Sequence, residues 1–339
     1  MKKFIILLSC IFILFEFSFG NKSIVLKELM KPSAIYVGNE RLFISEGTSI
    51  YIYSLKNYSL INKFGKKGEG PGEFRNTIGL IVPTNTGLII NSVGRLSYYT
   101  TGGELIKSFR TGIIPPQFNY FPVKDKFVGI SMNFKQLNSY FCVSIFDKEF
   151  NRQKQLLKIQ QTKNGKIFFF APQIAINSYF VYENKIYILS KNNSAIDILN
   201  YKGDKLKSFK HGFKKTKFNK KEKQIFLKLL NKSIKSMKKL SFNLKDNIML
   251  PEYYPIITKL KVSNKIIYIL GRKRNKENGK LQSIIRVFNL EGKKILENDI
   301  NLNFLDNTER VLITFDNFIF YKLKENENEE WILYIKHLK

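Results

Sequence analysis

The segment FGKKGEGPGEF, at residues 64–74, has a composition that could hold a phosphate group. Its four glycines would let backbone amides approach an anion closely. A phosphate-binding P-loop, however, requires the pattern GxxxxGK followed by Ser or Thr, between a strand and a helix. Here Gly70 is followed by Pro71, and both flanks alternate apolar and polar residues as strands do. We therefore interpret the glycines as residues of a tight connection between two sheets.

Residues with catalytic chemistry are few. The two histidines, His211 and His337, lie far apart in the sequence, whereas a histidine-based zinc site needs clustered ligands. The chain has no Gly-x-Ser-x-Gly motif, which would mark the nucleophile of a hydrolase. The carboxylates Asp125, Asp246 and Asp306 have no spacing that selects a metal-binding set. We therefore assign no catalytic residue and no metal ligand, and leave the cofactor unassigned.

Basic and aromatic residues in the second half of the chain are the best binding candidates. The segment GRKRNKENGK (271–280) supplies positive charge, and MLPEYYPII (249–257) supplies two aromatic rings. The candidate contact residues are Arg272, Lys273, Arg274, Tyr253 and Tyr254. The rings could stack on a sugar or a base, although packing beneath a neighbouring helix is an equal alternative.

The formal net charge of +30 favours an anionic partner, such as nucleic acid, an acidic polysaccharide or lipid headgroups. The alternative is a lysine-rich composition bias, because the lysines are spread over the whole chain as a solvated coat. Nucleic acid is not expected, since residues 271–280 lack the aromatic side chains that such surfaces interleave with basic ones. Apolar residues make up 44% of the chain, enough to fill a core.

Short strands must position these residues. From residue 35 onward, runs of alternating apolar residues end at turn residues, and the first four runs are AIYVGNE, RLFISEG, SIYIYSL and SLINKFG. Four more sets of four runs follow. The last turn of a set recurs, because TGGELIKSF (101–109) and YKGDKLKSF (201–209) share Gly, Lys, Ser and Phe at the same places. A four-stranded unit repeating about every 50 residues is typical of a β-propeller.

The two ends of the chain complete a sixth set. Three C-terminal runs, ERVLITF, NFIFYKL and EWILYIKHL, lack a fourth strand, and SIVLKELM (23–30) near the N-terminus is unmatched. Placed beside the last strand, residues 23–30 would finish a sixth blade and close the ring. The sequence therefore predicts an all-β fold, a six-bladed β-propeller closed by its N-terminal strand, over residues 21–339.

The glycine-rich segment is similar to the junction between NHL-type propeller repeats, in which a strand ending in Phe-Gly leads into a loop ending in Gly-x-Phe. The matching residues are Phe64, Gly65, Gly68, Gly70, Gly72 and Phe74. Arg75-Asn76 stands where that family often has proline. Over roughly residues 23–339, the chain resembles bacterial exported six-bladed propellers related to these repeats. This resemblance implies an architecture more than an activity, because propellers host many functions.

One face of the predicted propeller carries the longer connections. In a four-stranded meander, the loop between the second and third strands lies on the same face as the crossing to the next blade. The long connections on this face are residues 65–76, 113–117, 160–166, 271–280 and an insertion at about 214–255, between blades four and five. We interpret this face as the binding face; the alternative is that loops simply tolerate insertions.

The insertion contains a predicted helix that begins at a capping box formed by Asn219 and Glu222. Apolar residues recur along it at helical spacing, and lysines line much of the rest. We expect this helix to act as a lid that packs on the propeller. Contact of an amphipathic helix with an anionic membrane is the alternative.

Residues 1–20 have the pattern of a secretory signal peptide, with a basic start, an apolar run and small residues at the end. Glu16 interrupts the apolar run too early for a membrane span. Cys10 lies inside this run, so lipoprotein anchoring through it is the lesser alternative. Cys142 is then the only cysteine left, which allows no internal disulfide and indicates a buried thiol. We expect export to the periplasm, the cell surface or the medium.

These patterns predict a secreted monomer that acts as a binding or scaffold module for a protein or an anionic glycan, on the face that carries the helical insertion. The rival hypothesis is a metal-dependent hydrolase or lyase with its site at the channel mouth, as in propeller lactonases. Three or more Asp, Glu, Asn or His side chains converging near one end of the channel would favour the enzyme. An apolar or lysine-lined mouth would favour binding.

Overall fold

The computed structural model describes residues 22–84, 86–111, 117–135, 138–168, 170–236, 248–275, 277–300, 302 and 311–339. Predictions for the signal peptide, for Cys10 and for the carboxylates Asp246 and Asp306 lie outside these residues. Within them, the chain forms mainly antiparallel strands and two helices. The runs that the sequence marks as strands are strands, with ends that shift by a few residues.

Six sheets of four or more strands come from successive stretches of the described chain. The first sheet comprises β2 (Ala34–Gly38), β3 (Arg41–Glu46), β4 (Ser49–Ser54) and β5 (Leu60–Phe64). The second comprises β8 (Ile78–Thr84), β9 (Gly87–Ser92), β10 (Arg95–Tyr99) and β11 (Leu105–Arg110). The third comprises β12 (Gln117–Val123), β13 (Lys126–Lys135), β14 (Asn138–Phe146), β15 (Arg152–Lys163), β16 (Lys166–Phe168) and β21 (Ile248–Met249).

The remaining sheets follow the same plan. The fourth comprises β17 (Tyr179–Tyr182), β18 (Lys185–Leu189), β19 (Ala195–Leu199) and β20 (Lys205–Lys210). The fifth comprises β22 (Ile257–Ser263), β23 (Ile266–Arg274), β24 (Leu281–Asn289) and β25 (Lys294–Ile300). The sixth comprises β26 (Val311–Asp316), β27 (Ile319–Glu325), β28 (Trp331–His337) and β1 (Lys22–Val25).

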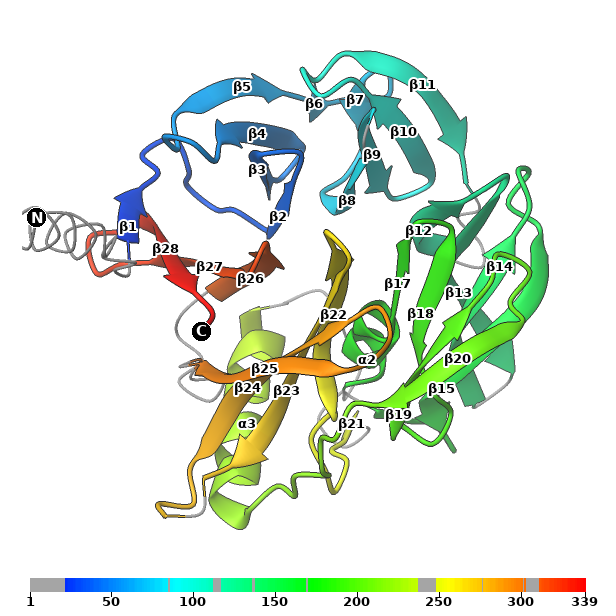
Figure 1. Ribbon diagram of the computed structural model, residues 1–339, viewed down its shortest axis with the longest axis vertical. Coiled ribbons are helices and arrows are strands. Elements are labelled where there is room, and N and C mark those ends of the chain that lie inside the picture. Colours follow the sequence, from blue (N-terminus) through cyan, green and yellow to red (C-terminus); the bar gives the residue numbers. More distant parts are fainter. Residues whose placement is uncertain are drawn as a thin grey trace, which may run out of the picture.

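The sheets are arranged around a common centre, with the first strand of each sheet innermost (Figure 1). Neighbouring first strands contact one another in the order β26, β2, β8, β12, β17 and β22. This arrangement is propeller-like. Each sheet buries both of its apolar faces against its neighbours, which a single sheet could not do alone.

Apolar clusters fill the space between adjacent sheets. Phe43 of the first sheet and Leu88 of the second belong to one such cluster, and Tyr187 of the fourth and Ile267 of the fifth belong to another. A further cluster joins Leu42 of the first sheet to Leu333 of the sixth, from opposite ends of the chain. Fully burying a side chain of this size contributes about 1.5–3 kcal/mol, so these clusters supply much of the stability. Cys142 is buried, as predicted.

The N-terminal strand is shorter than the sequence predicts. β1 pairs antiparallel with β28, from Lys22 opposite Ile335 to Val25 opposite Ile332. The chain then turns, and Leu26 and Leu29 are buried in the cluster shared by the first and sixth sheets. The predicted strand at 23–30 is therefore wrong in its second half, because these leucines pack into the core from a turn. The N-terminal end of the described chain and the C-terminal strand lie side by side (Figure 1).

The glycine-rich connection joins the first sheet to the second and contains two short parallel strands, β6 (Lys66–Lys67) and β7 (Glu73–Phe74). Gly65 has a φ of +87°, and a Cβ there would lie 2.5 Å from the Thr48 carbonyl oxygen. Gly72 has a φ of +75°. Both positions therefore favour glycine for reasons of backbone conformation, which agrees with the structural interpretation of this segment.

Residues 160–166 differ from the prediction of a long loop. Instead, β15 continues to Lys163 and forms a hairpin with β16, within the third sheet. Helix α2 (Ala171–Asn177), which the sequence analysis missed, then leads into the fourth sheet. β16 pairs in parallel with β21, which comes from the insertion after the fourth sheet.

Helix α3 (Lys220–Ser236) lies in the same insertion. The predicted capping box is present: the Asn219 side chain accepts from the Glu222 amide at 2.8 Å, and the Glu222 carboxylate accepts from the Asn219 amide at 2.9 Å. Phe226 packs against Phe170 and Phe218, which fixes one face of the helix to the protein.

Candidate functional site

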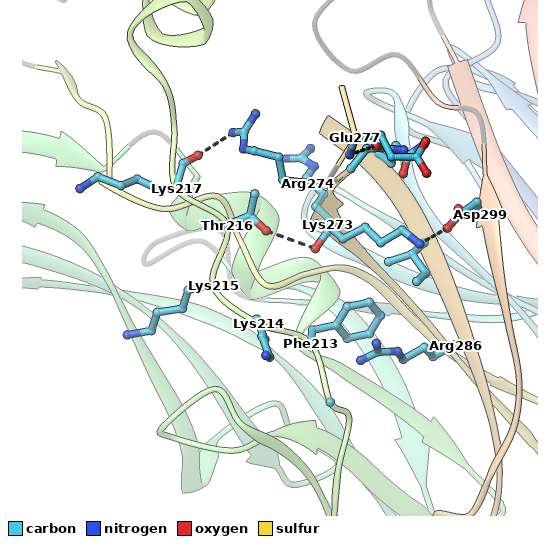
Figure 2. A pocket seen from close by; sticks show the side chains of 15 residues that line it. Phe213, Lys214, Lys215, Thr216, Lys217, Lys273, Arg274, Glu277, Arg286 and Asp299 are labelled. Atoms are coloured by element: carbon cyan, nitrogen blue, oxygen red, sulfur yellow. Dashed lines mark hydrogen bonds and ion pairs between the residues drawn. The ribbon is translucent and has the colours of Figure 1, made fainter. Parts of the chain in front are cut away.

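A basic cleft lies where the segment leading to α3 crosses the end of the fifth sheet. Its volume is about 670 Å³. The residues that line it are Gly212, Phe213, Lys214, Lys215, Thr216, Lys217, Arg272, Lys273, Arg274, Asn275, Glu277, Gln282, Ile284, Arg286 and Asp299. Figure 2 shows the cationic side chains around it. Its lining therefore carries more positive than negative side chains.

Arg274 has a structural role in this cleft. Its guanidinium donates to both carboxylate oxygens of Glu222, at 2.8 and 2.9 Å, and to the carbonyls of Lys217 and Gly279. Burial alone would raise the pKa of Glu222, but the bonds from Arg274 and Asn219 outweigh it and leave the pKa lowered. Arg274 thus fixes the first turn of α3 to β23.

Arg272 and Tyr254 are buried together beneath α3. The Arg272 guanidinium lies over the Tyr254 ring, 4.8 Å from its centre, and Tyr254 stacks on Phe218 with ring centres 3.5 Å apart. Burial lowers the pKa of Arg272 to about 10. These two residues support the wall of the cleft, and neither is largely exposed to an incoming ligand.

Lys273 and Tyr253 are more accessible. Lys273 forms an ion pair with Asp299 at 2.6 Å, and both side chains remain about half exposed. Tyr253 is 37% exposed and lies in a neighbouring pocket of about 190 Å³ together with Tyr254. The structure therefore brings Arg272, Lys273 and Arg274 into the cleft and places the two tyrosines beside it.

Sequence reasoning missed Lys214 and Lys215, which line the cleft on the segment before α3. Lys214 and Lys215 are exposed on the segment before α3, and neither forms an ion pair with any residue that the structure describes. Lys215 lies 5.6 Å from the centre of the Tyr253 ring. The signal that could have found them is the basic run KKTK (214–217), which comes shortly after the recurring turn YKGDKLKSF (201–209) of the fourth set.

Arg286 and His211 support the base of the cleft wall that carries Lys214 and Lys215. Arg286 pairs with Glu297 at 2.7 Å, donates to the His211 carbonyl at 2.9 Å, and lies over the Phe213 ring (Figure 2). The His211 Nδ1 accepts from the Phe213 amide, so Nε2 carries the proton toward the Asn193 carbonyl. Burial lowers the pKa of His211, which favours this neutral form.

The second candidate position is a central cavity of about 280 Å³. Residues from the first strand of each of the six sheets line it, among them Val37, Leu80, Phe121, Tyr179, Lys261 and Thr314. Asn39, Asn264 and Asp316 line the cavity, and Asn264 donates to Asp316 at 3.1 Å; side chains of these types would favour an enzyme if they converged. Two lysines, Lys259 and Lys261, line the same cavity, which is the pattern that would favour binding.

The remaining catalytic candidates do not converge. Asp125 is exposed in the turn between β12 and β13, and His211 follows β20 of the fourth sheet whereas His337 lies in β28 of the sixth. Among the described residues, no group of three His, Cys, Asp or Glu side chains is placed to hold a metal ion. Across the same residues, neither helix has the length and apolar character to cross a membrane.

Sheets packed around a central cavity define this chain as a propeller-like protein. No family model matches the chain, and no curated protein matches it either. A Bacteroides fragilis NCTC 9343 protein assigned as exported is 13% identical, with a TM-score of 0.56 over 94% of this chain and 95% of that one. This similarity shows a shared fold.

Two weaker similarities accompany it. A DUF4221 member from Bacteroides vulgatus ATCC 8482 is 10% identical, with a TM-score of 0.47 over 94% of this chain and 97% of that one. The WD40 domain of Neurospora crassa Pan2 is 11% identical, with a TM-score of 0.42 over 91% of this chain and 90% of that one.

Proposed function

We propose that this protein is an exported six-bladed β-propeller, related to NHL-repeat propellers and closed by its N-terminal strand, that binds an anionic glycan in the basic cleft. The observation that carries the binding role is the exposed, unneutralised charge of Lys214 and Lys215. Both are exposed on the cleft wall, and neither has a carboxylate partner among the described residues.

Two observations support closure of the ring. β1 supplies the outer strand of the sheet that ends with β28. The gap between the fifth and sixth sheets is bridged on the inner side, where Lys261 of β22 donates to the Phe315 carbonyl of β26 at 2.5 Å. An apolar cluster joins the same two sheets through Tyr268 and Phe315.

The export proposal rests on the sequence of residues 1–20. The Bacteroides fragilis protein that shares the fold is assigned as exported, which agrees with it. The link to NHL repeats rests on residues 64–74, whose glycine positions fit that junction.

A glycan fits the cleft better than a protein partner does. A volume of about 670 Å³ lies within the range of sites that enclose small ligands, of about 300–1,000 Å³. The exposed Tyr253 next to the cleft offers a ring on which a sugar could stack. Acidic sugars would in turn satisfy the lysines at the rim.

The rival proposal of a metal-dependent hydrolase has less support. Asp316 is the only carboxylate among the described residues that line the central cavity. Its Oδ1 already accepts from both Ser263 and Asn264, and the neighbouring Lys261 ammonium supplies positive charge. We therefore favour binding over catalysis.

A glycan array at two salt concentrations tests the proposal. We expect binding to uronic-acid or sulfated oligosaccharides at about 0.05 M salt and strong weakening at about 0.5 M, because salt screens exposed charges. Neutral oligosaccharides serve as the control. Failure to bind any acidic glycan at the lower salt concentration would remove this ligand class, and binding of an acidic protein alone would redirect the proposal to protein recognition.

A further inference from the structure

The central cavity contains two lysines that take no part in the basic cleft. Along β22, Leu260 and Val262 belong to the apolar cluster shared with the fourth sheet. Because side chains alternate along a strand, Lys259 and Lys261 point the other way, into the cavity and toward β26. Lys261 is buried, whereas Lys259 is partly accessible.

Backbone carbonyls of neighbouring first strands bind both ammonium groups. Lys259 Nζ donates to the Ile313 carbonyl, and Lys261 Nζ donates to the carbonyls of Phe315, at 2.5 Å, and Val37, at 3.0 Å. An ammonium group has three N–H donors. Each lysine therefore keeps at least one donor that carbonyl oxygens of the described residues do not take.

The charge of the cavity is unbalanced. The described lining residues include two ammonium groups and a single carboxylate, Asp316, which interacts electrostatically with Lys261. It is buried and accepts from Ser263 and from Asn264. With both lysines protonated, the cavity has one excess positive charge, which matches the charge of a monoanion.

Because of this imbalance, keeping both lysines protonated costs free energy. Burial, together with the smaller effect of the charge on Lys261, lowers the pKa of Lys259 to about 7. Burial lowers the pKa of Lys261 to about 8, while Asp316 acts against that shift. A bound anion would stabilise both ammonium groups and raise both pKa values.

We propose that the central cavity binds a small monocarboxylate, held by the ammonium groups of Lys259 and Lys261. Its apolar part would contact lining residues such as Leu80 and Phe180. The volume of about 280 Å³ limits the ligand to a small acid. This site is separate from the basic cleft and does not depend on glycan binding there.

Isothermal titration calorimetry of the full chain with acetate, benzoate and inorganic phosphate at pH 6.5 tests the assignment. We expect benzoate to bind more tightly than acetate, and phosphate to bind least, because phosphate has no apolar part to contact the cavity lining. Lys259→Met is expected to weaken benzoate binding at least tenfold. Lys336→Met, which removes an exposed lysine from β28, should leave it unchanged.

Two further measurements keep the test decisive. At pH 8, benzoate binding should take up protons, seen as a binding heat that depends on the ionisation enthalpy of the buffer. Asp316→Asn keeps the shape of the side chain and removes its charge, so benzoate should bind at least threefold more tightly. This variant decides the question if Lys259→Met fails to fold.

Three results would overturn the proposal. One is the absence of carboxylate binding by the wild-type protein at about 10 mM ligand, a concentration that would detect even weak affinity. Another is an unchanged benzoate affinity in a folded Lys259→Met variant or in Asp316→Asn. The third is tighter binding of phosphate than of benzoate.

Discussion

The guanidinium of Arg274 and the carboxylate of Glu222 form a two-point contact at 2.8 and 2.9 Å that joins β23 to the first turn of α3. The same carboxylate completes the capping box with Asn219. One acidic side chain therefore caps the start of the helix and attaches it to the fifth sheet. The segment that carries Lys214 and Lys215 leads into this turn, and Arg274 also donates to the Lys217 carbonyl at 2.7 Å.

Replacing Arg274 should destabilise the protein more than replacing an exposed cation of the same cleft. Glu222 is almost fully buried, so Arg274→Met leaves a buried carboxylate without its partner, at a cost of about 2–4 kcal/mol. Lys273→Met breaks an exposed pair and should cost less than about 1 kcal/mol. Urea denaturation of both variants measures the difference. Equal unfolding free energies would show that the Glu222 contact does not anchor the helix.

The same contact predicts a response to acid. The pKa of Glu222 lies below its ordinary value of 4.5 in the folded protein. Its contribution to stability is therefore present above pH 4.5 and is lost as the pH falls through the lowered pKa. Glu222→Gln should flatten the stability curve below pH 4.5. The measurement is urea denaturation between pH 3 and 6, and an unchanged slope in the variant would contradict the assignment.

The cavity lysines predict a second rise of stability with pH, in the neutral to basic range. Lys259 has a pKa of about 7 in the folded protein against an ordinary value of 10.5, so between these values the unfolded chain binds more protons. Stability should therefore rise as the pH increases from 7 to 9 in the absence of ligand. Lys259→Met should reduce this rise, and Lys336→Met should not. A decrease in the unfolding free energy of the wild-type protein over this range would contradict the lowered pKa of Lys259.

The glycine-rich connection offers a matched pair of substitutions. Gly65→Ala places a Cβ 2.5 Å from the Thr48 carbonyl oxygen and also strains the backbone, whereas Gly72→Ala strains the backbone only, with no heavy atom within 4 Å. Gly72→Ala should cost about 1–2 kcal/mol, and Gly65→Ala should cost more. Thermal unfolding compares the two variants. The reverse order would disagree with the described geometry of the connection.

Closure by β1 can be tested with proline. Leu26 donates its amide to the Trp331 carbonyl, and since bonded pairs alternate along antiparallel strands, Ile24 donates toward β28 while Ser23 points to the free edge. Ile24→Pro should therefore lose about 1–3 kcal/mol of stability, and Ser23→Pro should lose less. Urea denaturation distinguishes them. Equal effects would mean that the strand pairing contributes little to stability.

Local patterns predicted most of the fold. Alternating runs marked the strands, and Asn219 followed by Glu222 marked the start of α3, because both signals depend on neighbouring residues. The pairing of β16 with β21 could not be predicted, since it joins segments that are far apart in the sequence. Helix α2 was missed because it is a single short stretch of seven residues without a side-chain cap.

The site was harder to predict than the fold. The five candidates lie close together, but the sequence could not show that Arg272 and Tyr254 would be buried against each other. The run ITKLKVS indicated a strand with one polar face, and polar faces usually meet solvent. In a ring of sheets that face can instead point to a central cavity, as Lys259 and Lys261 do.

The most direct test of the proposed function is the affinity of the double variant Lys214→Gln/Lys215→Gln for the acidic oligosaccharide that binds best on the array. Its control is Lys185→Gln/Lys336→Gln, which removes the same charge from exposed positions on β18 and β28. We predict at least tenfold weaker binding for the cleft variant, a loss of about 1.4 kcal/mol, and little change for the control. Equal affinities of the two variants would contradict binding in the basic cleft.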